Sequence, residues 1–193
     1  MEDEKKTRLG FAMCGSFCTF RTAIDELRAL SAAGYDIYPI MSAAASSTDT
    51  RFGAAEDFRR EVAEICGREP MLTIKDAEPI GPKALLDVLL VEPCTGNTLG
   101  KLACGITDTP VTMAVKAHLR GGRPVVLAVS TNDALAASAR SIAALMNTKN
   151  IYFVPMRQDS PQNKPTSLVA DFGASRETIE NALSGKQLQP VYL

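Results

Sequence analysis

The stretch at residues 89–108, "LLVEPCTGNTLGKLACGITD", decides the fold because it changes from a buried strand to an amphipathic helix within a few residues. Its first residues are apolar, and Leu99, Leu102 and Ile106 then recur at the spacing of one helix face. Small polar residues at 93–98 separate the two patterns. A buried strand that runs directly into a helix is the repeating unit of an α/β protein.

The same alternation continues along the chain, as short apolar runs followed by longer segments of helical period. Strands are predicted at 8–13, 36–41, 87–92, 124–130 and 151–155, and helices at 19–33, 54–66, 98–105, 110–120, 133–146 and 175–184. The strands are apolar almost throughout, which indicates cover on both faces. We therefore predict one α/β domain over 1–193, with a parallel sheet of about five to six strands flanked by helices.

Two polar segments fall outside this pattern. Residues 156–167, "MRQDSPQNKPTS", are rich in proline and polar side chains and are predicted to form an arm or flap. Residues 186–193 are predicted to form a C-terminal tail. For the arm, an inert surface loop is an equally good interpretation. For the tail, contact with another subunit and packing onto its own domain both stay open.

Composition excludes several classes of protein. The chain has 193 residues, with 21 basic and 22 acidic side chains, so its net charge of −1 gives no general reason to bind nucleic acid or an anionic membrane. Its single histidine and its five cysteines show no metal-ligand spacing, so we predict no metal site. Cys14 and Cys18 are interpreted as small buried hydrophobes. The first ten residues lack a signal-peptide core, and we expect a cytoplasmic protein.

Four loops that follow predicted strands share one chemistry. They lie at 14–20, 42–53, 93–98 and 130–133, and each is small, rich in hydroxyl or amide groups, and leads into a helix. In a parallel sheet, the carboxyl ends of the strands lie along one edge, where ligands bind. Free N–H groups at helix N-termini attract phosphate, and Ser and Thr hydroxyls add hydrogen bonds. The loops therefore predict a ligand that carries phosphate.

Individual residues in these loops are candidates for that site. Glycine would let the ligand approach the backbone, hydroxyls would donate hydrogen bonds, and a lysine would add positive charge; these residues are Gly15, Gly96, Ser16, Ser42, Thr95, Thr98 and Lys101. For any single loop, simple capping of a helix explains the same residues. Neither GxGxxG nor a GK[ST] motif is present. The residues alone therefore indicate an α/β protein with a phosphate site.

The segment 93–108, "PCTGNTLGKLACGITD", resembles a known signature, PxxxNTxxKxAxGIxD. It is typical of the flavoprotein family that includes phosphopantothenoylcysteine decarboxylase, peptidyl-cysteine decarboxylases and flavin prenyltransferases. The matching residues are Pro93, Asn97, Thr98, Lys101, Ala103, Gly105, Ile106 and Asp108. The resemblance extends over roughly residues 8 to 155. It implies a Rossmann-like three-layer fold that binds FMN.

The resemblance also implies roles for site residues. FMN would contact the candidates above together with Pro93, Asn97, Ser130 and Thr131. Asn97 and Asn132 would act as catalytic residues near the flavin ring or the substrate.

Three departures from the decarboxylases bear on the reaction. The His-Ile pair expected about eight residues before Asp87 is replaced by Pro79 and Ile80. The PxMN motif is reduced to 129–132, "VSTN", and no cysteine follows Cys104. Oxidative decarboxylation of a cysteinyl substrate is therefore not expected.

Several segments instead resemble one branch of the family, among them "STDTRFG", "AEPIGPK", "NTKNIYFVPMRQDSPQNKP" and "QLQPV". Members of this branch work in spore-forming bacteria, in the mother cell, beside a nicotinamide-dependent A subunit. NAD(P) is expected on that partner and not on this chain. The implied reaction oxidises a dihydropyridine precursor to an aromatic pyridine dicarboxylate. Two alternatives stay open: a non-catalytic partner whose flavin site is structural or vestigial, and a decarboxylase of another substrate.

Such a substrate is a small dicarboxylate, and it would meet positive charge. The cations available are Arg51, Lys101, Lys116 and Arg157, and the sequence does not rank them. Relatives bind flavin between subunits, so the resemblance also implies a homo-oligomer, a trimer or a multiple of it.

Overall fold

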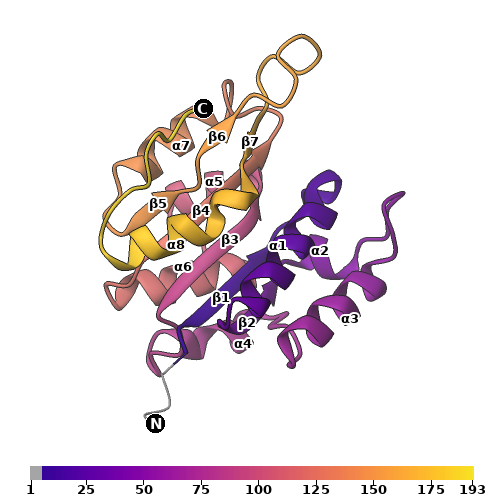
Figure 1. The fold of residues 1–193 in the computed structure, drawn as a ribbon, viewed down its shortest axis with the longest axis vertical. Helices are drawn as coiled ribbons and strands as arrows, with labels where there is room; N and C mark the ends of the chain where they lie inside the picture. The colour runs from indigo at the N-terminus through magenta and orange to yellow at the C-terminus, as the bar shows by residue number, and fades with distance from the viewer. Residues whose placement is uncertain (1–5) are drawn as a thin grey trace.

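A seven-stranded sheet forms the centre of the molecule, with the strand order β2-β1-β3-β4-β7-β6 and with β5 paired to β4 off this path (Figure 1). The computed structural model describes residues 6–193; residues 1–5, part of the charged N-terminal segment, lie outside the described residues. The strands are β1 (Arg8–Met13), β2 (Asp36–Met41), β3 (Val88–Cys94), β4 (Val125–Thr131), β5 (Ile151–Phe153), β6 (Met156–Arg157) and β7 (Leu168–Ala170).

The first five strands are parallel, and their spatial order is 2-1-3-4-5. The chain therefore moves outward from β1 in both directions, and the strand order reverses between β1 and β3. In sheets of this kind, the carboxyl ends at the reversal form a crevice that binds ligands. The expected Rossmann-like α/β fold is confirmed, and the predicted strands at 8–13 and 36–41 match the observed bounds.

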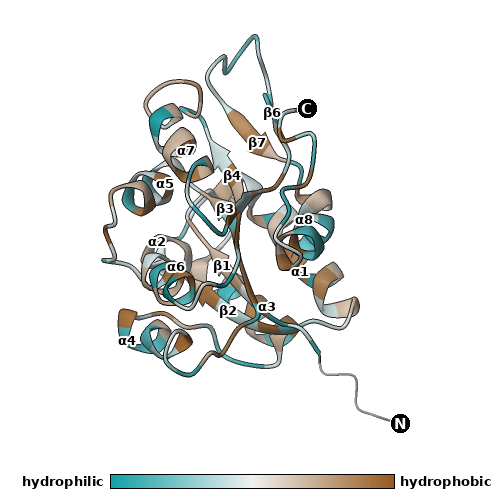
Figure 2. Ribbon diagram, turned by 90° about the vertical axis from the view of Figure 1, so that its left-hand side faces the viewer, coloured by the Kyte–Doolittle hydropathy of each residue, from teal (hydrophilic) through white to brown (hydrophobic). Residues whose placement is uncertain are grey.

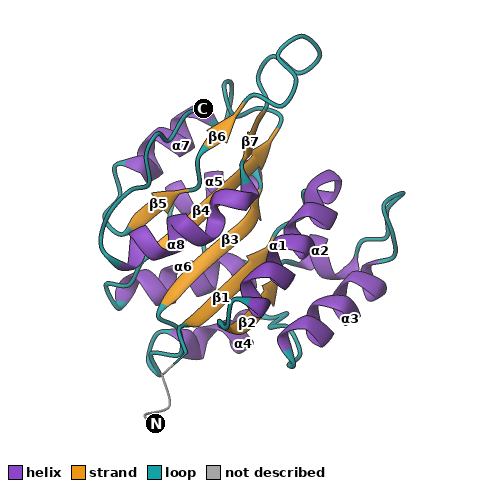
Figure 3. Cartoon of the chain, viewed as in Figure 1, coloured by secondary structure: helices purple, strands orange, loops and turns teal. Residues whose placement is uncertain are grey.

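The sheet is larger than predicted and is mixed. β7 pairs antiparallel with the end of β4, and β6 pairs antiparallel with β7 (Figure 3). The start of the polar segment 156–167 therefore joins the sheet as β6, β7 follows directly after its end, and the residues between the two strands project from the sheet. β3 is also longer than predicted, so Pro93 and Cys94 belong to the strand and not to the loop after it.

Helices cover both faces of the sheet, which gives three layers (Figure 2). One face packs against α5 (Gly96–Ala103), α6 (Pro110–Arg120) and α7 (Ala139–Met146), and the other against α1 (Phe20–Ala32), α3 (Ala55–Cys66) and α8 (Ser175–Leu183). Every residue of β3 is buried, and alternate side chains enter opposite cores. This explains why the strand is apolar almost throughout, with the buried Glu92 as its one charged residue, instead of alternating.

The helices form where periodicity and capping agree. In α1, Phe20, Ile24 and Leu27 share one buried face. Gly34 follows the end of this helix with a φ of +93°, a backbone conformation that favours glycine. At the start of α6, the side chain of Thr109 accepts a hydrogen bond from the backbone N–H of Thr112, and the side chain of Thr112 accepts one from the backbone N–H of Thr109. This reciprocal cap fixes the first turn of α6.

Some helix boundaries differ from the prediction. The helix expected at 133–146 begins only at Ala139, because the carboxylate of Asp133 accepts hydrogen bonds from the hydroxyls of Thr131 and Ser138 and residues 133–138 form turns. The helix expected at 175–184 does begin at Ser175, as α8, and the hydroxyl of Ser175 donates to the buried carboxylate of Glu92. Two short helices, α2 (Ala43–Ser47) and α4 (Ile74–Ala77), were not predicted.

The tail packs onto its own domain. The backbone N–H of Met156 donates to the carbonyl of Val191 at 2.9 Å, and the N–H of Leu193 donates to the carbonyl of Met156 at 3.0 Å. The side chain of Gln187 bonds to both backbone groups of Phe153. The chain end therefore lies beside β6, where Tyr192 and Met156 form an isolated parallel β-bridge. Tyr192 and Leu193 still keep more than half of their surface exposed.

Within residues 6–193, no helix has the length and apolarity that a bilayer crossing requires. The same residues contain no group of three or more His, Cys, Asp or Glu side chains arranged to hold a metal ion.

Candidate functional site

A cavity of about 560 Å³ lies at the carboxyl ends of the strands, where the strand order reverses. We call it the edge cavity. Its lining comes from the loop after β1 (15–19), a loop between α2 and α3 (51–52), Thr95, the end of β4 (130–132), and the arm with β7 (159, 164 and 167–169). Its volume falls in the range of small-molecule sites, about 300–1,000 Å³.

Three hydroxyls of this lining lie within hydrogen-bond distance of one another, and we call them the hydroxyl cluster: Ser16, Thr19 and Ser130. The Oγ atoms of Ser16 and Ser130 lie 2.9 Å apart, and Oγ1 of Thr19 lies 3.1 Å from Oγ of Ser16 and 3.3 Å from Oγ of Ser130. β1 and β4 are separated by β3 in the sheet, so the cluster joins the loop after β1 to the end of β4 across the strand between them. Three hydroxyls at this spacing can turn together toward one anionic group.

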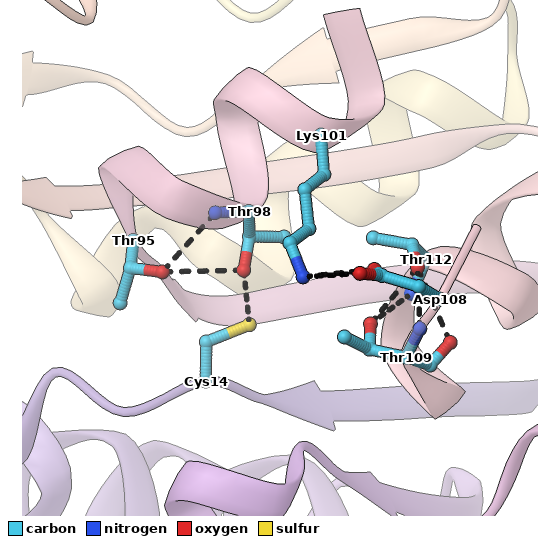
Figure 4. A network of polar contacts seen from close by, with 7 residues as sticks. All are labelled: Cys14, Thr95, Thr98, Lys101, Asp108, Thr109 and Thr112. Atoms are coloured by element: carbon cyan, nitrogen blue, oxygen red, sulfur yellow. Dashed lines mark hydrogen bonds and ion pairs between the residues drawn. The ribbon is translucent and has the colours of Figure 1, made fainter. Parts of the chain in front are cut away.

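The start of α5 adds the hydroxyl of Thr95 to the cavity lining. Thr95 caps the helix, because its Oγ1 accepts a hydrogen bond from the backbone N–H of Thr98 at 3.4 Å. The hydroxyl of Thr98 lies 3.2 Å from Thr95 Oγ1 and donates to Sγ of Cys14 at 3.1 Å (Figure 4). Burial raises the pKa of Cys14 to about 11, so this thiol stays protonated near neutral pH. Thr98 therefore ties α5 to β1 and does not face the cavity.

Lys101 turns away from the edge cavity. Its ammonium group contacts both carboxylate oxygens of Asp108, at 2.8 and 2.9 Å (Figure 4). The lysine also lowers the pKa of Asp108. This ion pair joins the last turn of α5 to the segment before α6.

Packing against neighbouring side chains explains why residue 96 is a glycine. A Cβ atom there would lie 2.6 Å from Oγ of Ser138, 2.7 Å from Oγ1 of Thr131 and 2.8 Å from Oδ1 of Asp133. The chain after β4 thus occupies the space that we expected a ligand to need. The two hydroxyls lower the pKa of Asp133, which stays ionised and holds Thr131 against the start of α5.

The predicted site residues divide into two sets. In the lining of the edge cavity are Gly15, Ser16, Thr95, Ser130, Thr131 and Asn132; outside it are Ser42, Pro93, Gly96, Asn97, Thr98 and Lys101. Ser42 caps α2 by accepting from the N–H of Ala45. The carbonyl of Pro93, which follows a cis peptide bond, accepts from the N–H of Cys14 and joins β3 to β1. Asn97 is exposed on the first turn of α5.

Several cavity residues were not singled out from the sequence. Phe17 and Thr19 lie in the loop after β1, next to the predicted residues Gly15 and Ser16. Thr19 could have been predicted from the sequence, because its hydroxyl belongs to the same loop as that of Ser16. Asp159 and Lys164 lie on the arm, and no local pattern in the sequence places them at the cavity. Cys18, expected to be buried, is exposed and lines the cavity, whereas Cys14 is buried as expected.

Comparisons with known proteins agree on one family. The family model described as Flavoprotein matches residues 1–177. The chain is 42% identical over 191 residues to the B subunit of dipicolinate synthase from Bacillus subtilis (strain 168), and the match covers 99% of this chain and 96% of that protein.

Two solved structures extend this similarity. The crystal structure of the B subunit of dipicolinate synthase from Bacillus halodurans is 43% identical, with a TM-score of 0.89 over 97% of this chain and 96% of that one. The FMN-dependent cysteine decarboxylase SpaF is 25% identical, with a TM-score of 0.68 over 92% of this chain and 97% of that one.

Proposed function

Because the chain belongs to the flavoprotein family, we propose that it is the FMN-binding subunit of a dipicolinate synthase. In this proposal it works with a nicotinamide-dependent A subunit during sporulation. Together they oxidise a dihydrodipicolinate-type precursor to dipicolinate. The end-to-end similarity to two B subunits supports the proposal, and the missing GxGxxG motif is consistent with NAD(P) binding on the partner.

The observation that carries the proposal is the hydroxyl cluster inside the edge cavity. Ser16, Thr19 and Ser130 lie at the point of the sheet where a nucleotide phosphate is expected to bind. Their hydroxyls would donate to the phosphate oxygens of FMN, as hydrogen bonds to a charged acceptor. We assign Thr131 and Thr95 to further polar contacts with FMN, and Gly15 to the close approach of the ligand.

Asn132 is the better placed of the two predicted asparagines. It lies in the lining of the cavity. Its backbone carbonyl accepts a hydrogen bond from the hydroxyl of Thr166 at 2.7 Å, which joins the residue after β4 to the arm. We propose that its side chain contacts the flavin ring or the substrate. When bound, FMN would supply the redox chemistry, and the protein would supply position and polarity.

An oligomer is part of the proposal. We propose a trimer or a multiple of it, as the family resemblance implies, with the exposed side chains of Tyr192 and Leu193 near a subunit contact. Light scattering of the purified chain measures the mass directly, and a monomer that still binds FMN would contradict this part.

The test uses the purified full chain. Titration with FMN is expected to saturate at one flavin per chain and to shift the flavin absorption bands. Addition of the A subunit, NAD(P)⁺ as the two-electron acceptor and the dihydropyridine precursor is then expected to form dipicolinate at a rate that depends on FMN. If FMN does not bind, the proposal fails. If FMN binds but dipicolinate forms equally fast without it, the flavin site is structural and the oxidation belongs to the A subunit.

A further inference from the structure

The charged side chains of the edge cavity leave one positive charge without a partner. The lining contains Arg51, Asp159 and Lys164. Nζ of Lys164 lies 2.8 Å from Oδ2 of Asp159, and this pair lowers the pKa of the acid and raises that of the amine. Among residues 6–193, Arg51 has no carboxylate within ion-pair distance. With the phosphate of FMN on the hydroxyl cluster, a second anion that enters the cavity would therefore meet Arg51 as its available cation.

A tight turn holds Arg51 at this position. The backbone N–H groups of Thr50 and Gly53 donate to each other's carbonyls at 3.0 and 3.1 Å, and the N–H of Phe52 donates to the hydroxyl of Thr50. Gly53 has a φ of +148°, which favours glycine, and a Cβ there would lie 2.9 Å from the ring of Phe58. Arg51 and Phe52 therefore form the tip of a turn whose base is fixed.

Neighbouring groups keep the guanidinium free for a ligand. Its central carbon lies 4.9 Å from the centre of the Phe52 ring, which orients the side chain by a cation–π contact without neutralising it. The nearest acid in the sequence, Asp49, is engaged elsewhere, because its carboxylate accepts a hydrogen bond from the N–H of Ala55 at the start of α3.

We propose that Arg51 binds a carboxylate of the substrate and sets the preference of the edge cavity for a dicarboxylate over a monocarboxylate. A guanidinium matches a carboxylate with two parallel hydrogen bonds, which gives orientation as well as affinity. This inference rests on the proposed function, because it takes the substrate class from there.

The structure thereby ranks the four cations that the sequence left equal. Lys101 is paired with Asp108, and Lys116 lines a separate hollow beside α6. Arg157, on β6, is not among the residues that line the edge cavity. Arg51 is the one of the four that does.

The test is calorimetric titration of the full chain, with and without FMN, using dipicolinate and its monocarboxylate analogue picolinate as probes. For Arg51→Gln we expect dipicolinate to bind about 10- to 100-fold more weakly, as for loss of hydrogen bonds to a charged group. Arg51→Lys should recover part of the affinity, and the preference for dipicolinate over picolinate should shrink in both variants. The exposed Arg140→Gln on α7 removes the same charge away from the cavity and should change nothing.

The outcomes separate the two proposals. FMN affinity is expected to be equal in the wild type and in Arg51→Gln, so failure of FMN to bind either protein overturns the proposed function alone. Equal dipicolinate affinity in the wild type and Arg51→Gln overturns the role of Arg51. Absence of dipicolinate binding to the wild type, with and without FMN, also overturns it.

Discussion

The β3–α5 segment is one region that brings polar side chains to this edge of the sheet, and the loop after β1 together with the end of β4 is another, but the two use these side chains differently. In the first region, Thr98 and Lys101 are engaged with Cys14 and Asp108, outside the edge cavity. In the second, Ser16 and Ser130 face each other inside it. The segment with the most recognisable sequence motif thus assembles the edge, and the less distinctive loops offer groups to a ligand.

Within the β3–α5 segment, substitution of Gly96 has the largest expected effect on stability. Gly96→Ala would place a methyl group 2.6–2.8 Å from three oxygen atoms of Thr131, Asp133 and Ser138. We expect the free energy of unfolding to fall by about 1–3 kcal/mol, as for overpacking of a filled site. Urea denaturation measures this change.

Gly100→Ala is the matched control, because it lies in the same helix and its Cβ would meet open space. It should raise the free energy of unfolding by about 0.5–1 kcal/mol. Equal stability of the two variants would show that the contact at Gly96 has no energetic weight.

Thr95 belongs to both regions, so its replacement should affect stability and ligand binding together. Thr95→Ala removes the cap of α5 and should cost about 1 kcal/mol of stability, and it also removes a hydroxyl from the cavity. Thr95→Ser keeps both functions and should behave as the wild type. Urea denaturation and FMN titration of the two variants check this. If Thr95→Ala loses only stability or only FMN affinity, Thr95 serves only the capping of α5 or only the cavity.

Lys101 should show the smallest effect. Lys101→Gln breaks a pair whose acid is mostly exposed to solvent, and such pairs often contribute nothing measurable. We expect unchanged FMN affinity and unchanged stability at physiological salt. A tenfold loss of FMN affinity would contradict this, and would return Lys101 to the set of phosphate contacts that its motif suggested.

The sequence predicts the framework well for a physical reason. Strands such as 8–13 and helices such as 110–120 carry their own periodicity and caps, so local pattern and final structure agree. Only the first part of the helix expected at 133–146 is wrong, because Asp133 binds one hydroxyl before it and one after it, and these contacts replace the first helical turns before α7.

The site was predicted less completely. The hydroxyls of Ser16, Thr95 and Ser130 could be placed at one edge because parallel strands end together. The roles of Gly96 and Lys101 could not, since they depend on which side chains the chain after β4 and Asp108 bring back to α5. Asp159 and Lys164 reach the cavity only because β7 pairs with β4, which is a contact between distant segments without a local signal.

The most direct test of this division is FMN titration of two variants that remove hydroxyls from the two regions. Ser16→Ala combined with Ser130→Ala takes two from the hydroxyl cluster, and Thr98→Val takes one from the contact with Cys14. We predict about a tenfold or greater loss of FMN affinity in the double variant and wild-type affinity in Thr98→Val. Wild-type affinity in the double variant, with the loss in Thr98→Val instead, would contradict it.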